Sequence, residues 1–164
     1  MREIDPKTTS RAKAFELWMK ATMPMVTMTK TYDITHLRRI ANRKGVKLNM
    51  LMCYAVVKAA SEFKEFYMLP VGDKLMEYDN LAINTIVITK DGGINTCDIP
   101  FSNDIHQFEA DYLRITALAQ TSAEDVVLGD DFMVIGSSAL TKCELDSVVN
   151  VYAGFWNNPF VVWS

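Results

Sequence analysis

The 164-residue sequence has little cysteine and no cysteine pair with metal-ligand spacing. Its three cysteines, Cys53, Cys97 and Cys143, lie far apart along the chain, and none belongs to a C-x-x-C motif. Their odd number and wide spacing indicate free thiols in a reducing compartment rather than a disulfide framework. The absence of a C-x-x-C pair also argues against a structural zinc site, and we expect no bound metal.

Long hydrophobic runs and an excess of one charge are absent as well. The apolar runs are far shorter than the roughly 20 residues that a membrane-spanning helix needs. Residues 1–6 lack the apolar region of a signal peptide, so we expect a cytoplasmic protein. The 17 basic and 20 acidic residues give a net charge of −3, without a basic stripe or an acidic tail. Neither a membrane nor a nucleic acid is therefore an expected partner.

Four segments show the apolar periodicity of amphipathic helices. They are residues 10–21, 35–43, 48–63 and 104–121. Segment 48–63 is apolar around most of its circumference, so we expect protein to surround it almost completely. In segment 104–121, the residues Phe108, Tyr112 and Ile115 share one face that we expect to be buried.

The remaining regular segments have the β-branched and alternating patterns of strands. They are residues 25–34, 66–69, 74–78, 81–89, 94–99, 132–137, about 146–153, and 159–164. Asp91-Gly92-Gly93 predicts a tight turn that joins 81–89 and 94–99 into a hairpin. The order of helices and strands predicts an α+β fold, a two-layer sandwich in which helices cover one side of a large mixed sheet.

Few side chains could carry out acid–base chemistry. His36 follows Asp33 closely, so it is either a general base oriented by that carboxylate or a solvent-facing residue beside a helix cap. His106, near the start of segment 104–121, is likewise either a base or a surface residue. The hydroxyls of Ser137 and Ser138 either stabilise negative charge in a cleft or bond to the local backbone. No nucleotide-binding glycine loop and no nucleophile elbow is present.

Several segments together resemble the chloramphenicol acetyltransferase family. They are Arg11–Phe15 (RAKAF), Tyr32–Thr35 (YDIT), Lys47–Leu48, Glu65–Tyr67 (EFY), Leu75–Asp79 (LMEYD), the strand from Phe132 to Ser137, and strand 159–164. Their order and spacing extend the resemblance over essentially the whole chain.

The resemblance implies a two-layer α+β domain that forms homotrimers and transfers the acetyl group of acetyl-CoA to a hydroxyl of a small molecule. By the same resemblance, Ser137 is the serine that stabilises the oxyanion and Lys47 approaches the CoA phosphate. Arg11 falls where an arginine pairs with the aspartate of the family's His-His-x-x-x-Asp-Gly motif. The base of the family is a histidine of that motif.

The chain departs from the family pattern at the acceptor positions. Val26 stands where antibiotic-modifying members have an aromatic residue that packs on the drug, and Thr96 lies near another such position. Val161 or Val162 replaces a threonine that holds an ordered water; we take Val162 as the acceptor-site position. These differences predict that chloramphenicol itself is a poor substrate.

The His-His-x-x-x-Asp-Gly motif is absent from this sequence. The resemblance therefore implies that the single domain of residues 1–164 lacks a final strand and helix and is inactive by itself. A non-catalytic protein that binds a ligand or assembles with other copies is the alternative. A third hypothesis makes His36 or His106 the base, which requires one of them to lie near Ser137.

Overall fold

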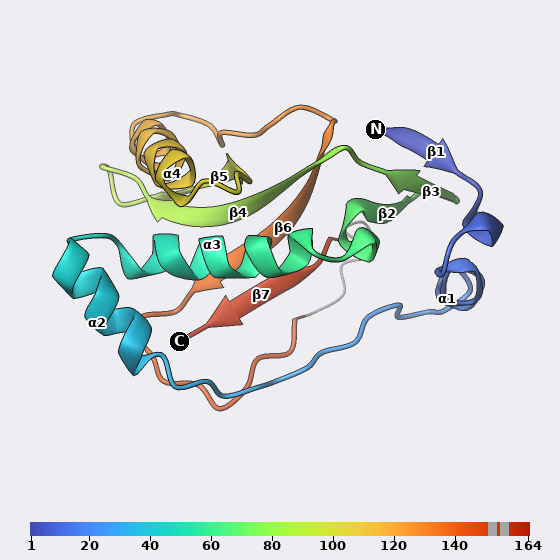
Figure 1. Cartoon of the computed structure of the whole chain (residues 1–164), viewed down its shortest axis with the longest axis horizontal. Coiled ribbons are helices and arrows are strands. Elements are labelled where there is room, and N and C mark those ends of the chain that lie inside the picture. Colours follow the sequence, from blue (N-terminus) through green and yellow to red (C-terminus); the bar gives the residue numbers. More distant parts are fainter. Residues whose placement is uncertain (151–153, 155–157) are drawn as a thin grey trace.

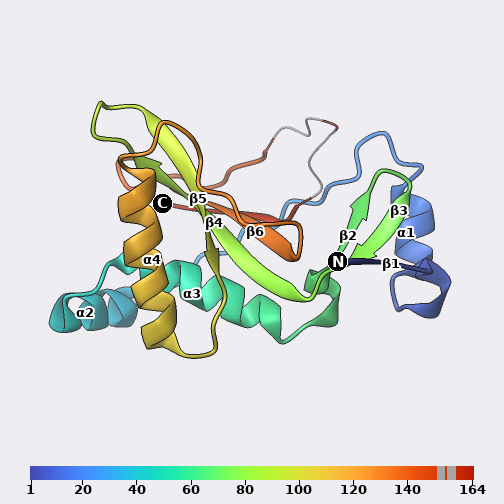
Figure 2. The ribbon, with the colours of Figure 1, turned by 90° about the horizontal axis from the view of Figure 1, so that it is seen from above.

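In a computed structural model, which describes residues 1–150, 154 and 158–164, the chain forms two β-sheets with the long helices on one side of the larger sheet (Figures 1 and 2). The helices are α1 (Ala12–Trp18), α2 (Thr35–Lys44), α3 (Leu48–Ser61) and α4 (Ile105–Ala119), with short 3-10 helices at Pro6–Thr8 and Lys64–Tyr67. The strands are β1 (Arg2–Ile4), β2 (Met68–Val71), β3 (Lys74–Glu77), β4 (Asn80–Ile88), β5 (Ile94–Pro100), β6 (Phe132–Ala139) and β7 (Phe160–Trp163).

The larger sheet is mixed and has the strand order β5-β4-β6-β7. Strands β4 and β5 form the predicted antiparallel hairpin, whereas β6 pairs in parallel with β4 and with β7. The expected strand at 159–164 is therefore present and is paired within the sheet. The α+β class and the mixed sheet are confirmed.

Helices α3 and α4 cover one face of this sheet and form the core with it (Figure 2). Alternate residues of each strand point to this face, because successive side chains of a strand lie on opposite sides. Fully buried core residues include Cys53 and Val57 of α3, Phe108 of α4, Ile83 of β4, Ile99 of β5 and Ile135 of β6. The face predicted for 104–121 is confirmed. The prediction for 48–63 holds for most of α3 and fails at one edge, where Ala55 and Ala59 are exposed.

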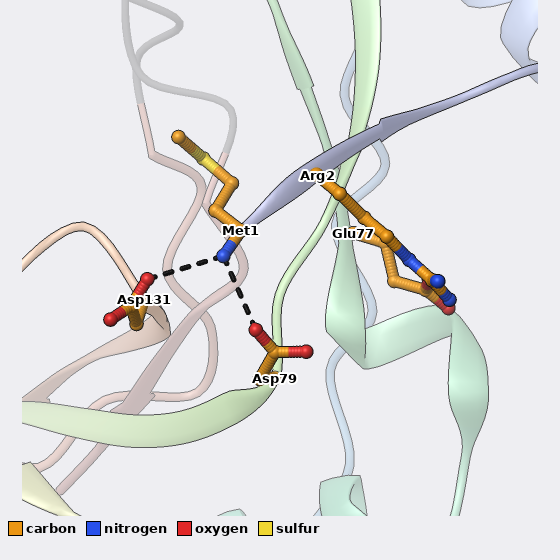
Figure 3. A network of polar contacts seen from close by, with 5 residues as sticks. All are labelled: Met1, Arg2, Glu77, Asp79 and Asp131. Atoms are coloured by element: carbon orange, nitrogen blue, oxygen red, sulfur yellow. Dashed lines mark hydrogen bonds and ion pairs between the residues drawn. The ribbon is translucent and has the colours of Figure 1, made fainter.

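A second, smaller sheet corrects the expectation of one large sheet. Its antiparallel order is β1-β3-β2, and β1 was not predicted. The N-terminal ammonium of Met1 lies 3.3 Å from the carboxylate of Asp79 and 3.2 Å from that of Asp131 (Figure 3). Asp79 directly precedes β4 and Asp131 directly precedes β6, so this contact ties β1 to the start of the larger sheet. Hydrogen bonds to Asp131 and then Asp79 raise the pKa of the Met1 amino group.

The predicted strand at 25–34 is wrong. This segment runs along the molecule between α1 and α2 and pairs with no described strand (Figure 1). Val26 and Met28 are 68% and 89% exposed. A β-branched run becomes a strand only where a neighbouring strand accepts its hydrogen bonds, and no such neighbour lies here among the described residues.

Two further features complete the fold. Residues 146–150 are not in a strand, and the rest of the strand expected at about 146–153 lies outside the described residues. Within the described part of the chain, no helix is long and apolar enough to span a bilayer.

Candidate functional site

Ser137 lies inside the core rather than beside a cleft. It is fully buried on the face of β6 that meets α3. Its hydroxyl donates a hydrogen bond of 2.6 Å to the backbone carbonyl of Asn84 and lies 3.8 Å from the thiol of Cys53. The proton of this hydroxyl is therefore already engaged in a hydrogen bond within the fold.

Ser138 presents its hydroxyl on the other side of the same strand. We call this side, away from α3 and α4, the outer face of the larger sheet. Ser138 is half-buried there, because the alternation of β6 turns Ser137 inward and its neighbour outward. Met133, Ile135 and Ser137 are the alternate residues of β6 that face inward. This alternation alone identifies Ser138 as the outward hydroxyl of the strand.

The outer face brings two predicted acceptor residues onto the same side as Ser138. Thr96 of β5 is paired with Ile86 of β4, and Val162 of β7 is paired with Ser138 of β6. Ile86 and Ser138 each lie two residues beyond the Asn84–Gly136 pair of the parallel strands β4 and β6. Thr96 and Ile86 are thus direct partners, as are Ser138 and Val162, and all four side chains lie on the outer face; we call them the outer row.

The same alternation places the two valines of β7 on opposite faces of the larger sheet. Val161 packs against the core, and Val162 lies on the outer face. Val26 is exposed in the segment between α1 and α2, and no described hydrogen bond joins it to the outer row.

Polar groups support the outer row from β4 and β5. The amide of Asn84 donates a hydrogen bond of 2.8 Å to the carboxylate of Asp98, which is buried and also accepts the backbone N–H of Leu128. Asp125 accepts the backbone N–H of Thr96 at 2.6 Å. These bonds hold the acidic loop of residues 122–131 along the free edge of β5, which fixes the position of Thr96 and covers the edge.

Lys47 lies between the end of α2 and the start of α3. It is the N-cap residue of α3, is exposed, and holds its ammonium 5.9 Å from the centre of the Tyr112 ring. Below it, the amide of Asn49 donates hydrogen bonds to the hydroxyls of Thr85 and Tyr112. Burial raises the pKa of Tyr112 to about 12, so this phenol stays protonated near neutral pH.

Arg11 is exposed at the start of α1. The nearby carboxylate of Glu65 accepts a hydrogen bond from Ser10 at 2.7 Å. No ion pair of Arg11 is found within residues 1–150, 154 and 158–164.

The two histidines are surface residues. His36 is exposed in the first turn of α2, just after Thr35, whose backbone N–H donates a hydrogen bond to Asp33. His106 is exposed at the start of α4, and its own backbone N–H bonds to Asp104. Ser137 is buried on β6 with Asn84 and Cys53 as its partners, so the structure does not bring either imidazole to it.

The buried thiols do not form a nucleophilic site. Burial is the largest cause that raises the pKa of Cys53 to about 11 and of Cys97 to about 12, so both remain neutral thiols at physiological pH. No group of three metal-ligating side chains occurs among the described residues. Two open hollows lie elsewhere. One, of about 490 Å³, lies beside β1, and one of about 320 Å³ lies at the start of α2.

Comparison with known proteins identifies the family. The sequence model of chloramphenicol acetyltransferase matches residues 1–138. Chloramphenicol acetyltransferase 3 of Escherichia coli is 25% identical over 114 residues, which cover 69% of this chain and 54% of that protein. Chloramphenicol acetyltransferase 2 of the same organism is 27% identical over 115 residues, covering 70% and 54%.

Solved structures agree on the fold. A chloramphenicol acetyltransferase structure superposes with a TM-score of 0.81 at 22% identity, covering 98% of this chain and 80% of that one. Azotobacter vinelandii dihydrolipoamide acetyltransferase gives 0.56 at 20% identity, covering 99% and 70%. The chain spans about half the length of the curated relatives it matches. A match over most of its sequence, with the same fold, shows that the chain belongs to the chloramphenicol acetyltransferase family.

Proposed function

We propose that this chain is the scaffold of an O-acetyltransferase that moves the acetyl group of acetyl-CoA to a hydroxyl of a small molecule. The observation that carries the proposal is the outer row. It combines the outward hydroxyl of β6, Ser138, with Thr96 and Val162, two residues that family resemblance assigns to acceptor binding. Family membership supplies the reaction class.

In this mechanism the acceptor oxygen attacks the thioester carbonyl while a base removes its proton. The carbonyl oxygen gains negative charge, and a hydroxyl donor stabilises it. The resemblance pointed to Ser137, but the proton of Ser137 is committed to the Asn84 carbonyl. We therefore propose that the hydroxyl of Ser138 donates the hydrogen bond to the oxyanion, and that Ser137 holds β6 against β4.

The proposal includes no base within the 164 residues. His36 and His106 are exposed on helices, and neither contacts the outer row by any described hydrogen bond. A general base contributes roughly 10²–10⁴ in rate. We therefore expect the 164-residue chain alone to be inactive toward chloramphenicol and other acceptors.

Thiol release from acetyl-CoA tests this function. The chain is mixed with acetyl-CoA and chloramphenicol or other hydroxyl acceptors, and free CoA is followed with a thiol reagent. We expect no release above the uncatalysed rate, together with calorimetric binding of CoA. Rapid CoA release would show that a base is present, and absence of CoA binding would contradict the acetyltransferase scaffold.

Non-catalytic assembly is the second candidate, and a trimer is the expected oligomer. Its supporting observation is the apolar exposure of the outer face at Ile88, Ile94 and Phe160, which are 65%, 71% and 47% exposed. Such surface is commonly covered by another chain. Sedimentation should give a trimer, and a clean monomer over a range of concentrations would contradict this. The free thiols are consistent with the cytoplasm that we propose as its location.

A further inference from the structure

Asp98 is the only charged side chain that is buried in the part of the chain that the structure describes. It is 6% exposed. One carboxylate oxygen accepts a hydrogen bond of 2.8 Å from the Asn84 amide, and the other accepts one of 3.1 Å from the backbone N–H of Leu128. Donors at both oxygens fit an ionised carboxylate, which only accepts hydrogen bonds.

Among the described residues, no positive charge neutralises this carboxylate. Asp98 takes part in no ion pair within residues 1–150, 154 and 158–164. The four strands of the larger sheet and the loop of residues 122–131 contain no lysine, arginine or histidine. A buried charge without an opposite charge opposes folding, and proteins keep such local conflicts mainly at functional sites. The missing positive charge therefore points to a ligand.

The carboxylate faces the side of the larger sheet that carries the outer row. Its two neighbours along β5 are fully buried in the core, so the alternation of the strand turns Asp98 to the outer face. Thr96 of the outer row lies two residues before it on this face, about 7 Å along the strand. Two strand spacings and two residues separate it from Ser138, which places the two backbones about 12 Å apart.

We propose that Asp98 selects the acceptor by its charge, so that the preferred acceptors are amino alcohols, which carry an ammonium group near the hydroxyl that is acetylated. The proposal rests on the proposed function, because it names the acceptor class of the outer row. An ionised carboxylate has about four acceptor positions, and the two donors leave the others free for a cation. Its attraction for a cation also acts over several ångströms in partly buried surroundings. An amino alcohol and the thioester that it attacks can together span the distance between Asp98 and Ser138.

Two compounds that differ at this one group test the proposal by calorimetric titration of the 164-residue chain. Chloramphenicol base carries a free amine, protonated near neutral pH, where chloramphenicol carries a neutral amide. We expect the parent chain to bind the base more tightly than chloramphenicol. Asp98→Asn keeps the shape of the side chain and removes its charge. This variant should bind the base about tenfold more weakly than the parent chain, and chloramphenicol within about twofold.

Asp130→Asn is the matched control, because it removes the same charge from an exposed carboxylate of the loop of residues 122–131. It should bind both compounds within about twofold of the parent chain. Asn84→Lys is a second test, since it places a positive charge directly opposite Asp98 on the neighbouring strand. It should weaken binding of the base more than binding of chloramphenicol. It replaces Asp98→Asn if circular dichroism shows that the latter is unfolded.

The outcomes distinguish this proposal from the proposed function. Equal binding of the base by the parent chain and by Asp98→Asn overturns the role of Asp98. An equal loss for both compounds also overturns it, because the residue would then be only structural. A parent chain that binds CoA but neither compound overturns the role of Asp98 and leaves the proposed function standing. A parent chain that binds neither CoA nor either compound overturns both.

Discussion

The neighbouring residues Ser137 and Ser138 face opposite sides of the larger sheet, and single substitutions distinguish their roles. Ser137→Ala removes a buried hydrogen bond to the Asn84 carbonyl and should lower the free energy of unfolding by about 1 kcal/mol. Ser138→Ala changes a half-buried position on the outer face and should cost less than about 0.5 kcal/mol. Urea denaturation measures both. A larger loss for Ser138→Ala would contradict the assignment of the inward hydroxyl.

The three cysteines should differ in reactivity. Cys53 and Cys97 are fully buried with raised pKa values, whereas Cys143 is exposed. At pH 8 a thiol reagent should titrate one thiol in the native chain and three in guanidinium chloride. Rapid reaction of two or three native thiols would show that the core is open.

Alkaline pH should weaken the fold through the same two thiols. The folded state holds them neutral up to about pH 11 and 12, whereas the unfolded chain ionises them near 8.5–9. Their contribution to stability is fully present below the unfolded pKa and is lost as pH rises above it. Denaturation midpoints of Cys53→Ala should therefore fall less steeply than those of the parent chain between about pH 9 and 11. Parallel curves would contradict the raised pKa of Cys53.

At the scale of elements, strand β7 is held against β6 by a glycine–aromatic pair. Gly136 is the direct partner of Phe160, and a Cβ at position 136 would overlap the Phe160 ring. Gly136→Ala should lower the free energy of unfolding by about 1–3 kcal/mol.

Phe160→Ala supplies the control for this pair, because it removes the ring that the new methyl group would strike. The double variant Gly136→Ala/Phe160→Ala should lose less stability than the sum of the two single variants. Strict additivity of the two free-energy changes would show that the predicted overlap does not exist.

How much of the molecule is predictable from sequence differs between elements. Helix 104–121 and the 81–89/94–99 hairpin carry complete local signals, a one-sided apolar face and an Asp91-Gly92-Gly93 turn, and both are confirmed. Segment 25–34 has strand composition but no partner, and partner choice is a tertiary property. The separate small sheet was missed because the three residues of β1 are too few to show alternation.

The candidate site was predictable only in part. Strand alternation separates Val161 from Val162 and Ser137 from Ser138, so the outer residue of each pair could be deduced once the inward set was known. The outer row itself depends on the register between β4, β5, β6 and β7, which alternation does not specify. The excess of lysine and arginine within residues 34–61, which contain no aspartate or glutamate, was invisible in the net charge, because acidic residues elsewhere in the chain cancel it.

For the whole molecule, the central claim is that the chain is the scaffold of an acetyl-CoA-dependent transferase, in which the outer row belongs to the acceptor site and Lys47 is the contact expected for coenzyme A. Amide NMR of the 164-residue chain during titration with CoA tests it most directly. The account predicts saturable shifts at Lys47, Ile86, Thr96 and Ser138, with little change around β1. Shifts confined to the hollow beside β1, or no shifts at all, would contradict it.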